Sequence, residues 1–237
     1  MMADFPSDNA AIATRGLSHT FGAGSVRVKV LHDIDLSIDR GEVVILMGPS
    51  GSGKTTLLTL VGCLRSVQSG SAQLLGQELA GADDPTLMRM RRRVGFIFQA
   101  HNLHESLTAI ENVRMGLEVH GPRAMRGWRP AAQRVLDLVG LEDRLDFLPE
   151  KLSGGQKQRV AVARALVGNP DVVFADEPTA ALDSKSGHQV MQILRSLADQ
   201  RGTTVFVVTH DHRVLDLADR IVQMEEGRIV DDGRKAS

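Results

Sequence analysis

The chain has 237 residues, of which 42% are apolar and 24% charged, as is typical of a soluble globular enzyme of one large domain or two small lobes. The formal net charge of −1 and the absence of tyrosine beside seven phenylalanines and one tryptophan argue against a nucleic-acid partner. The single cysteine, Cys63, excludes an intramolecular disulfide and a cysteine-based zinc cluster, and we expect it to be a small buried residue.

The sequence shows no segment that is suited to crossing or entering a membrane. No run reaches the roughly 18 consecutive apolar residues that span a bilayer, and residues 1–11 lack the basic and apolar stretches of a signal peptide. We therefore expect a cytoplasmic protein that reaches a membrane only through a partner.

The first 100 residues predict strands, with two helices between them. Alternating apolar residues at 11–17 and 26–38 indicate antiparallel strands. A buried strand, a helix, a short strand, a second helix and another short strand follow at 42–47, 54–64, 71–75, 85–92 and 94–98.

The pattern changes to helices alone at about residue 101. Helical spacing occurs at 107–117, 130–138 and 153–167, and the turn-rich segment 120–130 is interpreted as a surface connection. Strands and helices then alternate at 171–175, 184–200 and 203–209 and end in a hairpin of 220–224 with 228–230, after which 231–237 is expected to be disordered. We predict an α/β fold with a mostly parallel sheet and a helical insertion.

Residues 48–55 match the phosphate-binding pattern G-x-x-x-x-G-K-[ST] at every fixed position, between a predicted strand and a predicted helix. Glycines let successive backbone N–H groups approach phosphate oxygens, Lys54 would neutralise phosphate charge, and Thr55 would bind Mg²⁺. The alternative is a glycine-rich turn with a chance lysine. The predicted nucleotide-binding residues of this loop are Gly48, Pro49, Ser50, Gly51, Ser52, Gly53, Lys54, Thr55 and Thr56.

Two acids end the apolar run 171–175. Asp176 is placed at the carboxyl end of a buried strand, where it would coordinate Mg²⁺, and Glu177 would act as the general base on an attacking water. The alternative is a pair of surface acids in salt bridges.

A second glycine pair opens the helix predicted at 153–167. Ser153 and Gln156 form a capping-box pattern, but capping does not explain Gly154 and Gly155, which each weaken a helix by about 1 kcal/mol relative to alanine. Such glycines let backbone N–H groups approach an anion.

Residues 152–156 resemble the signature of ATP-binding-cassette proteins, and the likeness extends over about residues 11–231. The family implies one nucleotide-binding domain over 1–237, with a RecA-like P-loop core and antiparallel β subdomain in 11–100 and 166–231, and a helical subdomain in 101–165. It also implies a head-to-tail homodimer in which the signature, Ser153, Gly154, Gly155 and Gln156, covers the γ-phosphate of ATP bound to the other copy.

Four further residues have roles that the resemblance alone implies. Gln99 would touch Mg²⁺ and water, 181–183 with Asp183 would cross the dimer interface, and His210 would contact the γ-phosphate. Phe21 stands where the family has an adenine-stacking tyrosine, although it can also be a core residue.

Several segments resemble the MacB/LolD-type subgroup, namely 99–103, 107–112 and 177–187, while 62–68 and 112–118 are similar to DevA-type exporter ATPases. This implies an FtsX/MacB/DevC-like membrane permease as partner, with a periplasmic adaptor and an outer-membrane channel, and a place on the inner side of the membrane.

One other reading remains beside the exporter ATPase: an FtsE-type ATPase would regulate a membrane partner without transport and would share all the local chemistry. Two further classes do not fit. DNA-repair ATPases have long coiled coils or zinc modules, whereas this sequence has no sustained heptads and a single cysteine, and translation-associated ATPases have two cassettes in one chain, which 237 residues do not accommodate. The arginines of 89–93 form either a solvated helix face or a contact with acidic elements of the permease.

Overall fold

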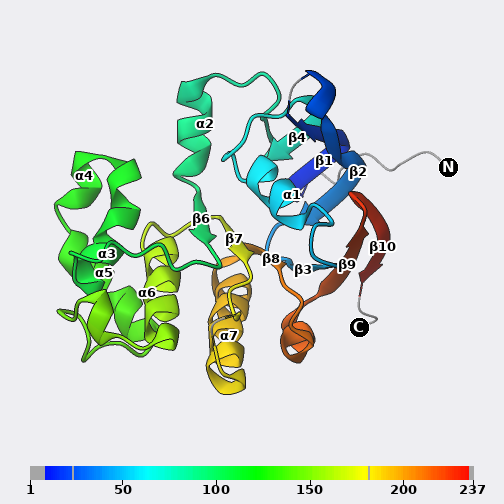
Figure 1. Ribbon diagram of the computed structural model, residues 1–237. Helices are drawn as coiled ribbons and strands as arrows, with labels where there is room; N and C mark the ends of the chain where they lie inside the picture. The colour runs from blue at the N-terminus through cyan, green and yellow to red at the C-terminus, as the bar shows by residue number, and fades with distance from the viewer. Residues whose placement is uncertain (1–8, 23, 181, 235–237) are drawn as a thin grey trace.

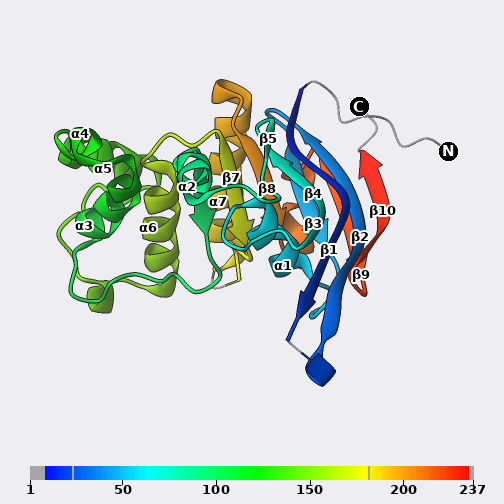
Figure 2. The same cartoon turned by 90° about the horizontal axis from the view of Figure 1, so that it is seen from above.

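The computed structural model describes residues 9–22, 24–180 and 182–234. Two sheets lie at one side of the molecule and a group of helices at the other, and Figures 1 and 2 show this separation from two directions. The α/β fold predicted from the sequence is confirmed.

A six-stranded sheet forms the centre, in the order β10-β9-β3-β8-β7-β6 within the described residues. All neighbouring pairs are parallel except β9 and β10. Its strands are β3 (Val43–Met47), β6 (Val94–Ile97), β7 (Val172–Asp176), β8 (Thr204–Val208), β9 (Arg220–Glu225) and β10 (Arg228–Arg234). Because β3, β7 and β8 run in the same direction, the loops that follow them emerge at one edge.

Both faces of this sheet are buried, since successive side chains point to opposite sides. Val43, Ile45 and Val207 face α7 (Ser184–Arg201) and the helices, whereas Leu46 and Phe206 pack with α1 (Lys54–Val61) and the second sheet. The continuous apolar runs of β3 and β8 follow from this double burial.

The second sheet is antiparallel, in the order β2-β1-β4-β5. This confirms the predicted N-terminal antiparallel part. Its strands are β1 (Ala10–Phe21), β2 (Val28–Asp39), β4 (Ser69–Leu74) and β5 (Gln77–Glu78), with a 3₁₀ turn η1 (Gly24–Val26) between β1 and β2, and α2 (Asp84–Arg91) follows it.

The helical part lies between β6 and β7, where α3, α5 and α6 pack together (Figure 1). Its elements are α3 (Ala109–Arg114), η2 (Met115–His120), α4 (Pro122–Met125), α5 (Trp128–Leu138), η3 (Pro149–Lys151) and α6 (Gly154–Leu166). A further 3₁₀ helix, η4 (His212–Leu217), precedes β9.

Residues 120–130 lie at the surface as expected, but they are more helical than the expected turn-rich connection. Pro122 occupies the first helical position of α4, where its missing N–H costs nothing, and α5 already begins at Trp128 with Pro130 in its first turn. The predicted domain bounds themselves stay a prediction.

The disorder expected at 231–237 was wrong for residues 231–234, because β10 continues to Arg234, and residues 235–237 lie outside the described residues. The reason is an ion pair: the guanidinium of Arg220, only 5% exposed, is held by the carboxylate of Asp232 and donates to the carbonyl of Ser37 at 2.8 Å. A buried arginine needs such a partner, so Asp232 stays on the sheet.

Cys63 is buried as expected, and burial raises the pKa of its thiol to about 11. Over the described ranges, none of the helices combines the length and the apolar character needed to cross a bilayer.

Candidate functional site

The loop between β3 and α1 has a shape that requires glycine at two positions. At Gly48, with φ of 149°, a Cβ atom would lie 1.9 Å from the carbonyl oxygen of Met224. At Gly53, with φ of 98°, it would lie 2.8 Å from Cδ2 of Leu31. Gly53 is also the N-cap of α1, so it leaves the first backbone N–H groups of that helix without a side-chain cap.

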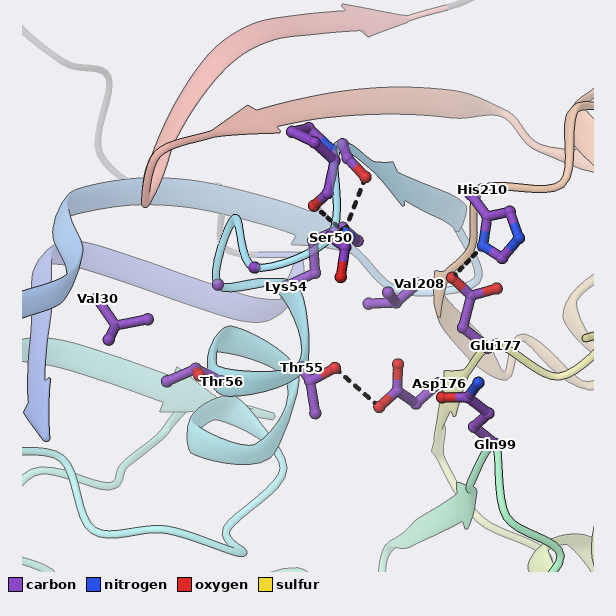
Figure 3. A pocket seen from close by; sticks show the side chains of 14 residues that line it. Val30, Ser50, Lys54, Thr55, Thr56, Gln99, Asp176, Glu177, Val208 and His210 are labelled. Atoms are coloured by element: carbon purple, nitrogen blue, oxygen red, sulfur yellow. Dashed lines mark hydrogen bonds and ion pairs between the residues drawn. The ribbon is translucent and has the colours of Figure 1, made fainter.

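A cavity of about 610 Å³ opens at the edge of the sheet where this loop lies (Figure 3). Residues from β2, the phosphate loop and the ends of β7 and β8 surround it. The lining residues are Val30, Gly48, Pro49, Ser50, Gly51, Gly53, Lys54, Thr55, Thr56, Gln99, Asp176, Glu177, Val208 and His210.

Lys54 is held inside the loop, with only 9% of the residue exposed. Its Nζ donates to the carbonyl oxygens of Gly48 and Pro49, both at 2.8 Å, and to Oγ of Ser52 at 3.4 Å. Burial lowers the pKa of Lys54, and the carboxylates of Glu177 and Asp176 oppose that shift. The loop thus places a cation at the wall of the cavity.

Asp176 and Thr55 come from different elements and meet in the cavity. The Thr55 hydroxyl donates to Oδ2 of Asp176 at 2.9 Å, and Figure 3 shows the amide of Gln99 beside the same carboxyl group. Burial raises the pKa of Asp176, while the hydrogen bond from Thr55 opposes the shift. A half-buried carboxylate with one hydroxyl donor is suited to binding a cation.

The donors at this point are a hydroxyl, a carboxylate and an amide, which are the oxygen ligands that Mg²⁺ prefers. Across the described residues, no group of three or more His, Cys, Asp or Glu side chains forms a metal cage. The hydroxyl of Thr55, the carboxylate of Asp176 and the amide of Gln99 fit a magnesium ion.

Glu177 adopts an unusual backbone conformation, with φ of 50°. Non-glycine residues in this region carry strain, which persists where the surroundings fix it. Its N–H donates to the carbonyl of Val208 at 2.8 Å, its Oε2 accepts from the Thr209 hydroxyl at 3.1 Å, and its Oε1 lies 2.8 Å from Nδ1 of His210. The Glu177 side chain is 13% exposed and that of His210 is 75% exposed, so the pair reaches from the sheet towards the surface.

Three residues in or beside the cavity were not identified from the sequence. Val30 of β2 and Val208 of β8 line the cavity, and Thr209 orients Glu177. A signal was available for Thr209, because it separates a buried strand from His210, but its bond depends on the tertiary pairing of β7 and β8.

Phe21 and Ser52 do not line the cavity, although both are predicted nucleotide contacts. Ser52 is 3% exposed and points inside the loop. Phe21 ends β1 half-buried, with the ring of His19 edge-on at 4.7 Å and the guanidinium of Arg65 at 5.0 Å. Its role in adenine stacking stays a prediction.

The signature residues lie away from the cavity, at the start of α6. Ser153 Oγ accepts from the Gln156 N–H at 3.2 Å, and Gln156 Oε1 accepts from the Ser153 N–H at 2.9 Å, which confirms the capping box. Gly154 begins the helix, and a Cβ on Gly155 would lie 3.3 Å from Leu182.

Asp183 also has a structural contact of its own, as N-cap of α7. Its carboxylate accepts from the N–H and the hydroxyl of Ser186, at 2.9 and 2.8 Å, and these bonds lower the pKa of Asp183. Ala181, the first residue of the predicted interface loop, lies outside the described residues.

Comparison with known proteins identifies the family of the chain. The family model described as "ABC transporter" matches residues 31–180. The chain is 44% identical to the macrolide export ATP-binding/permease protein MacB of Shewanella sp. (strain W3-18-1), over 95% of this chain and 35% of MacB. It is also 44% identical to the lipoprotein-releasing system ATP-binding protein LolD 2 of Rhodospirillum rubrum, over 92% of this chain and 95% of LolD 2.

These relatives confirm the predicted MacB/LolD-type subgroup. The chain spans about a third of the length of the MacB relatives, and nearly all of LolD 2.

Solved structures agree with the fold. The model is similar to a dimeric post-hydrolysis state of the ATP-binding cassette MJ0796 bound to ADP and Pi, with a TM-score of 0.89 and 38% identity, over 95% of this chain and 99% of that one. A second dimeric structure of MJ0796, a bacterial ABC transporter cassette, has the same TM-score at 39% identity, with the same coverage of both chains. The chain therefore belongs to the ABC transporter family and is an ATP-binding ATPase of that family.

Proposed function

We propose that this ATPase uses Mg²⁺ with ATP, closes its catalytic site only as a head-to-tail homodimer, and powers a separate membrane permease in a MacB- or DevA-like export system. The observation that carries the proposal is the separation within one chain of the phosphate cavity from the start of α6. Lys54, Thr55, Asp176 and Glu177 line the cavity, whereas the signature residues at the start of α6 lie elsewhere.

In the cavity, the phosphates lie against the backbone N–H groups of the glycine loop and against Lys54. Thr55, Asp176 and Gln99 would hold a magnesium ion, and such an ion would neutralise charge on the phosphate oxygens. Glu177 accepts the proton of the attacking water.

Two neighbours prepare Glu177 for that step. Thr209 and His210 bind its two carboxylate oxygens, which fixes the direction in which the base points. His210 is largely exposed, so its ring can also contact the γ-phosphate.

A second copy supplies the remaining contacts. Ser153 and the two glycines present a hydroxyl and backbone N–H groups at an exposed helix start, which suits them to stabilise charge on a γ-phosphate bound elsewhere. The two structures of MJ0796 are dimeric, which supports the same assembly here.

Mixing two inactive variants tests this shared site. Lys54→Ala disables the phosphate loop, and Ser153→Asp keeps a good helix cap but places a negative charge against the γ-phosphate. Each variant alone should be nearly inactive. A 1:1 mixture should recover roughly a quarter of the parent rate, because about half of the dimers are mixed and each of those has one intact site of two.

The mixture is measured by steady-state phosphate release at a fixed total concentration of chain. Activity in the mixture that merely equals the average of the two variants alone would show that the cavity and the signature act within one chain.

The permease is expected to bind at a groove of about 420 Å³ between α2, β6, η2 and α6. Its walls are largely apolar, with Phe96, Phe98 and Val119, and Arg91 and Arg92 stand at its rim. This lining fits a short helix that carries apolar and acidic side chains. Through such a partner the chain would lie on the inner side of the membrane, and an adaptor and outer-membrane channel would complete the export system.

A further inference from the structure

The segment after β6 runs between the two cavities. Gln99 lines the nucleotide cavity, whereas Phe98 and Asn102 line the groove. The segment lies between the end of β6 at Ile97 and the start of α3 at Ala109, without helix or strand structure. The orientation of the Gln99 side chain therefore depends on side chains from other elements that bind this backbone.

Two residues of α6 provide that hold. Arg164 donates from Nη1 to the carbonyl of Asn102 at 2.6 Å and from Nη2 to the carbonyl of His101 at 2.8 Å. The side chain of Gln158 accepts through Oε1 from Nδ1 of His101 at 2.6 Å. A carbonyl oxygen only accepts, so this contact requires the imidazole proton on Nδ1.

The planar guanidinium makes this contact geometrically selective. Its two parallel N–H groups match two successive carbonyls, a pattern that the point charge of lysine does not reproduce. Asn102 has φ of 49°, so the backbone turns at the residue whose carbonyl accepts from Arg164.

The side chain of Gln158 is unfavourable for the stability of the fold. It is 1% exposed, and its Nε2 has no hydrogen-bond partner among the residues that the structure describes. A buried polar group without a partner costs about 1–3 kcal/mol, so an apolar side chain would serve packing better. The hydrogen bond to His101 explains why a polar side chain stands at this position.

We propose that Arg164, assisted by Gln158, is a positioning residue that fixes the backbone of His101 and Asn102 and thereby directs the amide of Gln99 into the nucleotide cavity. Because α6 begins at the signature, the same helix then determines the positions of both Gln99 and Ser153. This inference rests on the proposed role of Gln99 in binding magnesium and water.

The chain offers a matched control on the same helix. Arg159 is half-buried like Arg164 and donates from Nη1 to the carbonyls of Val139 and Gly140, at 3.0 and 3.4 Å. It therefore makes the same kind of contact with a segment that does not lead to Gln99.

Arg164→Lys is expected to lower kcat for ATP hydrolysis by about 10- to 100-fold, since a misplacement of about 1 Å at a catalytic site can cost that much. The KM for ATP should stay within about twofold, because the phosphate loop is untouched. Arg159→Lys should leave kcat near the parent value. Equal effects of the two variants on kcat would overturn the proposal.

A double-mutant cycle with Gln99→Ala separates positioning from a general structural role. If Arg164 acts through Gln99, then adding Arg164→Lys to Gln99→Ala should lower kcat no further. If the fold-loss of kcat in the double variant equals the product of the losses in the two single variants, Arg164 does not act through Gln99. That result would overturn the inference while leaving the role of Gln99 intact. A parent-like kcat for Gln99→Ala itself would instead refute the proposed function of Gln99, and the inference with it.

Gln158→Met gives a readout that a stabilising role cannot mimic. It removes the unpaired buried amide and keeps the side-chain volume, so the melting temperature should be unchanged or higher. The kcat should nevertheless fall several-fold, because His101 loses its anchor. A parent-like kcat in this variant would remove Gln158 from the proposal.

Discussion

The polar groups at the edge of the parallel sheet and those at the start of α6 differ in where they find their partners. At the sheet edge, Lys54, Asp176, Glu177 and His210 come from distant parts of the sequence and meet around one cavity of their own chain. At the start of α6, Ser153 and Gln156 bond to each other in a capping box, and the surface beyond them is exposed.

This difference indicates how the two regions divide the work. Groups that converge within one chain can bind the ground state, since the phosphate loop is already closed around Lys54. In the proposed dimer, the groups at the start of α6 would reach the nucleotide only on assembly, and they would stabilise charge that develops during hydrolysis. Nucleotide binding is therefore expected from a monomer, and rapid hydrolysis only from a dimer.

Glu177→Gln gives the largest expected effect on the sheet-edge side of this comparison. The amide keeps the shape and can still accept from Thr209, but it cannot take a proton from water, so kcat should fall by about 10²- to 10⁴-fold. ATP affinity should persist, and an ATP-bound dimer should accumulate on size-exclusion chromatography.

The control is Glu225→Gln, at an exposed acid at the end of β9 outside the cavity. It should hydrolyse ATP at the parent rate. Parent-rate turnover by Glu177→Gln would mean that the base is another group.

A smaller effect is expected at the groove between α2, β6, η2 and α6. Arg92 is exposed and lines the groove, and Arg92→Glu would oppose an acidic partner segment at a cost of several kcal/mol. The permease complex should weaken by about 10²-fold in co-purification from membranes, while the isolated chain keeps its ATPase rate.

Arg89→Glu makes the same change in α2, three residues before Arg92, the C-cap of that helix, but outside the groove lining. It should assemble like the parent. Loss of assembly in both variants would favour a general charge effect, and loss in neither would leave Arg92 as a solvated or structural residue.

The sequence predicted the phosphate loop and the strand-end acids because both depend on local patterns. The glycine spacing of 48–55 and the apolar run before Asp176 determine the local backbone without knowledge of distant residues. The helix start at Ser153 was predictable for the same reason, since a capping box spans only four residues.

What the sequence could not predict depends on contacts across the fold. The left-handed backbone of Glu177 follows from the bond of its N–H to Val208 on a neighbouring strand. The order of 231–234 follows from the burial of Arg220, and the hold of Arg164 on Asn102 joins segments 62 residues apart. The sequence around a charged terminal segment, or around an arginine in a helix, does not indicate which distant residue will bind it.

The smallest expected effect separates the capping role of Ser153 from its role in hydrolysis. Thr108 caps α3 in the same kind of capping box, with Glu111 in the place of Gln156. Ser153→Ala and Thr108→Ala should each lower the free energy of unfolding by about 1 kcal/mol, and the melting temperature by about 2–4 °C.

Only Ser153→Ala should also lower kcat, by about tenfold, which corresponds to one hydrogen bond of about 1.4 kcal/mol to the γ-phosphate. Calorimetry and phosphate release on the same samples measure both quantities. If the two alanine variants lose stability and activity in the same proportion, Ser153 acts as a helix cap alone, and the exposed start of α6 has no direct part in the shared site.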